Sequence, residues 1–254
     1  MWHNIRLLNL LANTLLCLCV LTLLIAGLWY FSQRPMFDIQ SIVIRNAKGG
    51  ELKRVNELVI KNFVLPKIEK NFFSIDLDSA RETFESVPWV RRAEVRRSWP
   101  NKLEVVVEEY TPIGTWGDSQ LMSSEGEVFT ANIAEAEDDV QLIEFNGPIG
   151  RGNLVFKRYL ELKGLLEEVK LKPVSLKLSK NFFWSAKMMN GMAVRFGREG
   201  EGSLSWKDLI KRFIYLYPCL TKQFGDNIVS VDLRYANGLA LKTTGGPVVV
   251  DQGR

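Results

Sequence analysis

The residue types that most often bind metals or act as general bases are scarce in this chain. Among its 254 residues are one histidine, His3, and three cysteines, Cys17, Cys19 and Cys219. A Cys/His zinc site needs several such ligands, and Ser-His or Cys-His catalysis needs a histidine within reach of the nucleophile. His3 lies at the N-terminus, ahead of a long apolar run. We therefore expect no metal site, no catalytic triad and no cofactor.

Two pairs of adjacent carboxylates, Glu108-Glu109 and Asp138-Asp139, are the remaining candidates for acid–base chemistry. Neighbouring residues on a strand point to opposite faces, so Glu108 and Glu109 cannot converge on one bond. We interpret both pairs as solvated surface charge. The glycine-rich run 197–202 resembles a phosphate loop, but it lacks the Lys-Ser/Thr ending and carries two glutamates. We interpret it as a surface turn, and we expect that the protein is not an enzyme.

A basic stripe with a tryptophan at each end could mark a binding surface for single-stranded nucleic acid. Apolar and acidic residues interrupt the stripe, as they do in a half-exposed strand. The net charge of +4 also divides into +2 before residue 35 and +1 in each of 35–110 and 111–254, whereas a nucleic-acid binder usually concentrates its charge. We favour a charged strand face or partner surface, and expect neither nucleic acid nor a small-molecule substrate. The stripe consists of Trp89, Arg91, Arg92, Arg96, Arg97 and Trp99.

An uncharged segment, residues 7–31, determines on which side of a membrane the rest of the chain lies. As a helix rising about 1.5 Å per residue it spans about 37 Å, enough to cross a hydrocarbon core of about 30 Å. A cleaved signal peptide is the alternative, but its apolar region is normally shorter. Arg6 precedes the segment, so the positive-inside rule predicts a cytoplasmic tail, residues 1–6, and a single-pass type II protein. The bulk of the chain would then lie outside the cytoplasm, in the periplasm of a cell with two membranes.

Residues 37–110 predict a small α+β module with the order β-α-α-β-β and a three-stranded sheet. A strand with a one-residue slip near Ser41 is followed by a helix at 51–64 and a second helix at 78–86. Period-two patterns at 90–99 and 103–107 predict the other two strands. Between them, Pro100 occupies the second position of a predicted type I turn.

Residues 111–244 predict a second unit, a mainly antiparallel β domain with two helices, followed by a tail at 245–254. The helices are expected at 154–169 and from Ser205 until Pro218 interrupts the second one. Asn190-Gly191 predicts a tight hairpin. A last strand through Val229, Val231, Leu233 and Tyr235 is expected to turn at Asn237-Gly238 into a final strand at 239–243.

The final hairpin offers a possible binding surface, because an unpaired sheet edge can accept a strand from another protein. Arg234 and Tyr235 precede the turn, and both are residue types enriched at interface hot spots. Alternatively, the edge is protected by its own charge and by residues 248–250 folding back. The residues alone support these two interpretations equally.

Several motifs resemble the POTRA module and β domain of the bacterial FtsQ/DivIB cell-division family. The resemblance extends from the N-terminal anchor to about Thr243. The motifs that carry it are Asn71–Asp76, Pro88-Trp89-Val90, Val95–Asn101, Glu108–Pro112, Tyr217-Pro218, Val231–Tyr235 and Asn237-Gly238.

This resemblance implies a non-enzymatic scaffold in the inner membrane, concentrated at the division septum. It implies that the POTRA module serves recruitment and contacts other septal membrane proteins. It also implies that the end of the β domain binds the division protein FtsB, which travels with FtsL. The matching positions for that contact are Arg234, Tyr235, Asn237, Gly238, Leu239, Ala240, Leu241 and Lys242.

Under this hypothesis an FtsB strand pairs with the edge at 239–242, while Arg234 pairs with an acidic side chain of the partner and Tyr235 packs against it. A second hypothesis is a POTRA-containing chaperone or translocation accessory that binds extended polypeptides. Such proteins usually carry several POTRA modules, and one such pattern is visible here. A third, an anchored cell-wall hydrolase, lacks convergent catalytic groups.

Overall fold

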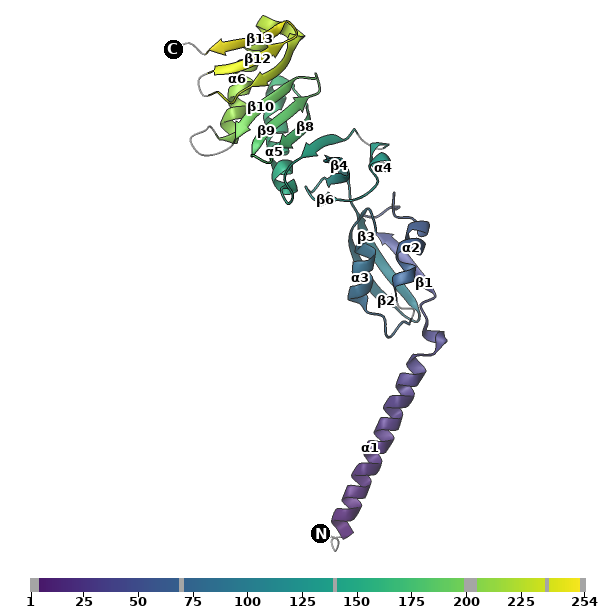
Figure 1. Cartoon of the computed structure of the whole chain (residues 1–254). Helices are drawn as coiled ribbons and strands as arrows, with labels where there is room; N and C mark the ends of the chain where they lie inside the picture. The colour runs from purple at the N-terminus through teal and green to yellow at the C-terminus, as the bar shows by residue number, and fades with distance from the viewer. Residues whose placement is uncertain (1–4, 69–70, 139–140, 199–204, 236–237, 252–254) are drawn as a thin grey trace. The chain divides into compact units, whose positions relative to one another are not determined.

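The computed structural model describes residues 5–68, 71–138, 141–198, 205–235 and 238–251. The chain divides into two compact units, residues 1–109 and 110–254. The first contains the long helix α1 and a small α+β module; the second contains a large sheet with its helices (Figure 1). This is the α+β architecture predicted from the sequence.

Helix α1 (Ile5–Ser32) is, within the described residues, the one helix long and apolar enough to cross a membrane, over Asn9–Ser32. Its 28 residues extend about 42 Å at 1.5 Å per residue, more than the roughly 30 Å of a hydrocarbon core. Its leucines from Leu10 onward are exposed rather than packed against the rest of the chain. The helix thus fits the predicted single membrane span. Residues 1–4, among them His3, lie outside the described residues.

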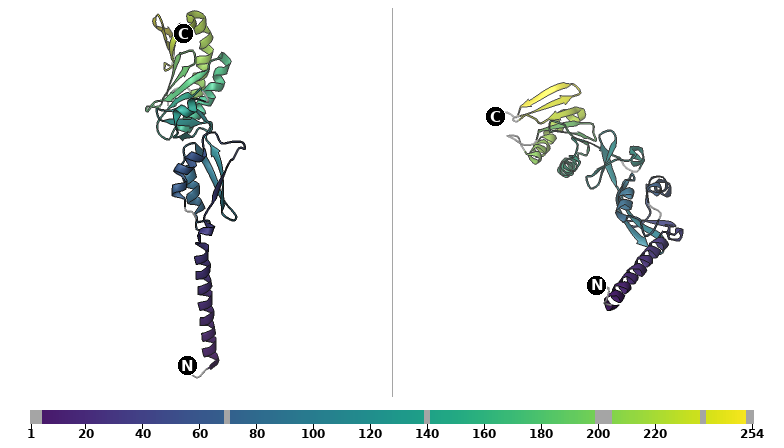
Figure 2. Two further views of the ribbon diagram at one scale, coloured as in Figure 1. Left: turned by 90° about the vertical axis from the view of Figure 1, so that its right-hand side faces the viewer. Right: turned by 60° about the horizontal axis from the view of Figure 1, so that its bottom comes forward.

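The α+β module has a three-stranded sheet in the order β1-β3-β2. Strand β1 pairs parallel with β3, and β2 pairs antiparallel with it. Figures 1 and 2 show the two helices on one face of this sheet, and Phe84, Leu103, Val105 and Val107 are fully buried between the layers. The elements are β1 (Ser41–Asn46), α2 (Glu57–Phe63), α3 (Leu77–Glu85), β2 (Val90–Ser98) and β3 (Lys102–Glu109).

The order of these elements is as predicted, but two local predictions are wrong. The first strand begins only at Ser41, because residues 35–37 form a 3₁₀ turn. The first helix begins at Glu57 rather than residue 51, with the Asn56 side chain accepting the Val59 N–H at its N-terminus. The predicted turn lies where expected, between the paired residues Ser98 and Lys102, and the peptide bond between Trp99 and Pro100 is cis.

The second unit contains a ten-stranded sheet in the order β13-β12-β11-β10-β9-β8-β7-β4-β5-β6. Most neighbours are antiparallel; β4–β7, β7–β8 and β10–β11 are parallel. Its strands are β4 (Pro112–Trp116), β5 (Gln120–Ser123), β6 (Val128–Phe129), β7 (Ile143–Asn146), β8 (Pro173–Leu178), β9 (Phe183–Met188), β10 (Ala193–Arg198), β11 (Ile228–Asp232), β12 (Gly238–Thr243) and β13 (Gly246–Asp251).

Two long helices, α5 (Gly152–Leu166) and α6 (Trp206–Phe224), pack together against this sheet. Figure 2 shows both on the same face. Trp206 at the start of α6 is buried against the rings of Trp184 and Phe196. A short helix, α4 (Ile133–Glu137), precedes β7; neither of these two elements was predicted.

The predicted helix positions hold, with one correction. Ser205 caps α6, where its hydroxyl accepts the Asp208 N–H, and Asn190-Gly191 connects β9 and β10 with Gly191 at φ +86°. Pro218, however, does not end α6, which continues to Phe224. The helix survives this proline because its apolar face, including Phe213 and Leu220, is buried on both sides of it.

Candidate protein-binding surface

Glu108 and Glu109 are structural, and our interpretation of them as solvated surface charge is wrong. They do point to opposite faces, as predicted. The Glu108 carboxylate pairs with Arg91 at 3.2 Å and with Lys48 at 3.3 Å. The Glu109 carboxylate accepts three consecutive backbone N–H groups, those of residues 53–55, at 2.8 to 2.9 Å. These bonds hold the loop outside α2 and explain why the helix starts late.

The basic stripe is also largely engaged within the molecule. Arg91 pairs with Glu108, and Arg96 pairs with Glu94 at 3.0 Å. Arg97 donates from Nε to the Phe72 carbonyl at 2.9 Å. Arg91 and Arg97 therefore stabilise the α+β module, whereas Arg92 is exposed and Arg96, paired with Glu94, is 72% exposed.

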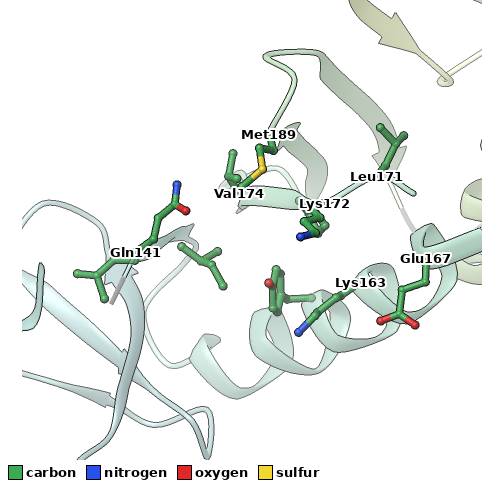
Figure 3. Close-up of a pocket in the computed structure, with 11 residues that line it drawn as sticks. Gln141, Lys163, Glu167, Leu171, Lys172, Val174 and Met189 are labelled. Atoms are coloured by element: carbon green, nitrogen blue, oxygen red, sulfur yellow. The ribbon is translucent and has the colours of Figure 1, made fainter. Parts of the chain in front are cut away.

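A pocket of 390 Å³ opens beside the C-terminal half of α5. Figure 3 shows Lys163 and Glu167 on the helix side and Gln141, Val174 and Met189 across the pocket from them. Its lining is mostly apolar, and its charged groups do not form a nucleophile with an adjacent base. Elsewhere in the described parts of the chain, no three His, Cys, Asp or Glu residues are placed to hold a metal ion. The glycine-rich run continues into residues 199–202, which lie outside the described residues, as does Asp139; Asp138 is exposed.

Asp232 and Arg234 form a close ion pair where β11 ends. Arg234 donates from Nε to Asp232 Oδ1 at 2.9 Å and from Nη2 to Oδ2 at 2.6 Å, and its backbone N–H donates to Oδ1 at 3.1 Å. Burial, with Asp232 only 8% exposed, acts to raise the pKa of this carboxyl. The hydrogen bonds and charge of Arg234, with the charge of Arg195, outweigh it and lower the pKa below its usual value. Arg234 thus has a partner within its own chain.

This ion pair also corrects the predicted end of the strand. We expected β11 to continue to Tyr235, but it ends at Asp232, whose side chain binds the backbone two residues later in the manner of an Asx turn. Leu233 is still buried, whereas Tyr235 is 56% exposed.

Arg212 on α6 holds the connection between β11 and β12. Its Nη1 donates to the Tyr235 carbonyl and its Nη2 to the Gly238 carbonyl, both at 2.8 Å. One guanidinium thus binds the backbone on both sides of residues 236–237, which lie outside the described residues and include the predicted site residue Asn237. Sequence reasoning missed Arg212, because nothing in its local pattern indicates a contact with residues 23 and 26 positions later.

The predicted edge strand is paired on both sides. β12 pairs antiparallel with β11 and, from Gly238↔Asp251 to Thr243↔Gly246, with β13. The prediction that 239–242 form the free edge is therefore wrong, and β13 is the last strand at this end of the sheet. The Gly245-Gly246 turn makes the pairing possible, because Gly246 adopts a φ of +127° that residues with a side chain rarely adopt.

The predicted site residues therefore divide into an exposed and a buried group. Arg234, Tyr235 and Lys242 are exposed, and Gly238 and Ala240 are half-buried on or beside β12. Leu239 and Leu241 point into the core, with 1% and 2% exposure. Arg234, Tyr235 and Gly238 lie at the connection between β11 and β12, held by Asp232 and Arg212, whereas Lys242 lies farther along β12, opposite Ser230. We call this group, Arg234, Tyr235, Gly238, Ala240 and Lys242, the β12 surface.

Comparisons with known proteins agree with the two-unit organisation. A family model for the FtsQ-type POTRA domain matches residues 50–110, and one for the C-terminal part of cell division protein FtsQ/DivIB matches residues 114–234. β12 and β13 follow the matched residues.

Curated relatives match along almost the whole chain. The cell division protein FtsQ of Burkholderia pseudomallei is 41% identical over 251 residues, covering 99% of this chain and 98% of that protein. FtsQ of Bordetella pertussis is 38% identical, covering 95% and 92%, and FtsQ of Nitrosospira multiformis is 32% identical, covering 96% and 100%. With its membrane helix, POTRA module and β domain, the chain belongs to the FtsQ/DivIB family of cell division proteins.

Proposed function

We propose that this protein is a non-enzymatic scaffold of the division septum that binds FtsB, and through it FtsL, at the end of its β domain. It would be anchored in the inner membrane by α1, with its N-terminus in the cytoplasm and both folded units in the periplasm. The POTRA module would contact other septal membrane proteins. Family membership and the single apolar helix support this assignment.

A binding role fits the chemistry of the molecule better than catalysis does. Glu108 and Glu109, which we considered for acid–base chemistry, are engaged in structural contacts, and the charged groups of the pocket beside α5 do not form a nucleophile with an adjacent base. An exposed tyrosine beside a sheet edge is instead typical of a protein interface, since its ring supplies large contact area at low entropic cost.

The observation that carries the proposal is the way Tyr235 is presented. Tyr235 is 56% exposed, yet its backbone is held by Arg212 and follows directly on the Asp232–Arg234 pair. A side chain on a pre-organised backbone loses less entropy when it binds a partner. We infer that Tyr235 packs against FtsB while a strand of FtsB pairs with the backbone at this end of the sheet.

The test is co-purification of the full chain with FtsB and FtsL. Tyr235→Ala should lose most of the bound partner, and Tyr215→Ala is the matched control, because Tyr215 on α6 is also exposed, at 83%. Equal recovery of FtsB with both variants would refute this placement. Arg234→Glu is a poor probe, since it would place a second carboxylate against that of the buried Asp232.

Removal of residues 245–254 tests which strand the partner meets. If FtsB replaces β13 beside β12, the truncated chain should bind FtsB more tightly, because no internal strand competes. If FtsB adds to the outer edge of β13, truncation should abolish binding. Unchanged binding would show that neither edge takes part.

Localisation and orientation need separate measurements. A fluorescent fusion should concentrate at midcell in dividing cells, and a uniform envelope signal would contradict a septal role. Alkaline phosphatase fused to the C-terminus should be active, because that enzyme folds in the periplasm. Broad binding of unrelated extended peptides, without midcell enrichment, would favour a chaperone instead.

A further inference from the structure

The chain leaving α1 is tied at once to the α+β module. The carbonyl of Ser32, the last residue of α1, accepts a hydrogen bond from Asn71 Nδ2 at 3.0 Å. The Phe37 carbonyl accepts the Phe72 N–H at 2.9 Å. The loop at 71–75 therefore lies against the segment that emerges from the helix.

The tip of the β2–β3 hairpin lies at the same end of the module. The Gln40 N–H, just before β1, donates to the Asn101 carbonyl in that tip at 3.0 Å. Arg97 near the end of β2 donates to the carbonyls of Phe72 and Ile75 in the 71–75 loop. Hairpin tip, loop and emerging chain are thus joined by hydrogen bonds.

Three large apolar side chains are exposed at this end. Trp99 at the hairpin tip is 80% exposed, Met36 is 61% exposed and Phe73 is 51% exposed. We call Met36, Phe73 and Trp99 the juxtamembrane rim. The Phe73 ring also packs edge-on against Phe37 at 5.0 Å, and Phe37 packs against Phe31 of α1 at 5.4 Å. Aromatic contacts therefore run from the membrane helix to the rim.

We propose that the juxtamembrane rim lies in the interfacial layer of the lipid bilayer, with Trp99 as its anchor. Tryptophan is enriched at that depth because its ring is apolar while its N–H can reach water or a headgroup. α1 is longer than the hydrocarbon core, so its last turn, with Trp29 and Tyr30, extends into a headgroup layer about 5–7 Å thick on each side. The α+β module, which is hydrogen-bonded to Ser32 through Asn71, therefore begins within the headgroup layer.

A cation beside the emerging chain suits the same occupant. Arg34 lies over the Tyr30 ring at 4.5 Å and donates to its hydroxyl, while Asp38, the nearest acidic residue along the chain, is half-buried and pairs with Asn71. Cations beside interfacial aromatics are attracted to lipid phosphates. The rim would hold the POTRA module against the membrane surface, independently of which protein the β domain binds.

The test uses a fluorescent probe next to the intact Trp99. In a full chain with Cys17, Cys19 and Cys219 changed to serine, Lys102→Cys carries an environment-sensitive dye. The chain is reconstituted in nanodiscs of phosphatidylcholine with or without phosphatidylglycerol, some containing headgroup-nitroxide lipid. Ala47→Cys is the control site, because Ala47 pairs by its N–H with Val107 at the opposite end of the sheet.

We expect the nitroxide lipid to quench most of the emission at position 102 and little at position 47. Adding Trp99→Ala should lower the fraction of the emission at 102 that the nitroxide lipid quenches, measured for the same chain against nanodiscs without that lipid. Weak quenching at both sites would overturn the proposal, as would a dye at 102 that is shielded from water but not quenched, which would indicate a protein contact. Undiminished quenching in the Trp99→Ala chain would refute the anchoring role of Trp99.

Discussion

Replacing Arg212 with alanine tests whether one side chain organises the β12 surface. The guanidinium makes two charge-assisted hydrogen bonds, to the carbonyls of Tyr235 and Gly238, both at 2.8 Å. One of these bonds is exposed to solvent and the other is partly buried, so water replaces part of the loss. From about 1.5–3 kcal/mol for a buried bond to a charged group, we expect a total cost of about 2 kcal/mol.

This cost should be local, because Arg212 binds the connection between two strands rather than the core. A change of about 2 kcal/mol corresponds to about a 30-fold rise in the opening equilibrium of that connection. Hydrogen exchange measured by mass spectrometry should therefore show about 30-fold less protection at 238–243, with peptides from β8 and β9 unchanged. Co-purification of FtsB should fall as well, because Tyr235 loses its fixed backbone.

Two further variants make this prediction specific. Arg212→Lys keeps the charge but loses the planar fork that reaches both carbonyls, so its protection should fall between those of wild type and Arg212→Ala. Lys211→Ala removes an exposed cation from the same helix and should change nothing. Equal protection at 238–243 in Arg212→Ala and Lys211→Ala would refute the role assigned to Arg212.

Three other substitutions test contacts described above. Asp232→Asn should destabilise the β domain, because the pKa of the Asp232 carboxyl is lowered in the folded chain. Urea denaturation should show that the variant loses a constant free energy of unfolding at neutral pH. This difference from wild type should shrink below about pH 4, where the wild-type carboxylate becomes protonated. Glu109→Ala should cost the α+β module about 2–3 kcal/mol, because three backbone N–H groups lose their acceptor; an unchanged urea midpoint would contradict this. Pro218→Ala should stabilise α6 by about 1–3 kcal/mol in thermal unfolding, and a lower melting temperature would show that the proline is needed where it stands.

The elements that the sequence predicted well are those specified by local pattern. A long uncharged run can only be α1 or a signal peptide, alternation of Leu103, Val105 and Val107 indicates β3, and Asn190-Gly191 indicates a hairpin. Each depends on residues close together in the chain, so periodicity and turn chemistry are sufficient.

Most of the failed predictions involve contacts between distant segments. The late start of α2 depends on Glu109, more than 50 residues away. The pairing of β12 with β13 depends on a glycine turn that brings the end of the chain back onto the sheet. Pro218 looked like a helix end because its local cost is visible in sequence, whereas the packing that offsets the cost is not.

The candidate surface shows the same division. The sequence alone determined that Arg234 and Tyr235 lie just before the turn at Asn237-Gly238. The scarcity of histidine and cysteine favoured binding over catalysis. The tertiary structure decided which of these groups are free to meet a partner. It placed Leu239 and Leu241 in the core, engaged Arg234 with Asp232, and left Tyr235 exposed on a backbone held by Arg212. Local sequence specifies which side chains are available, but burial and hydrogen bonding across the fold determine which of them face outward.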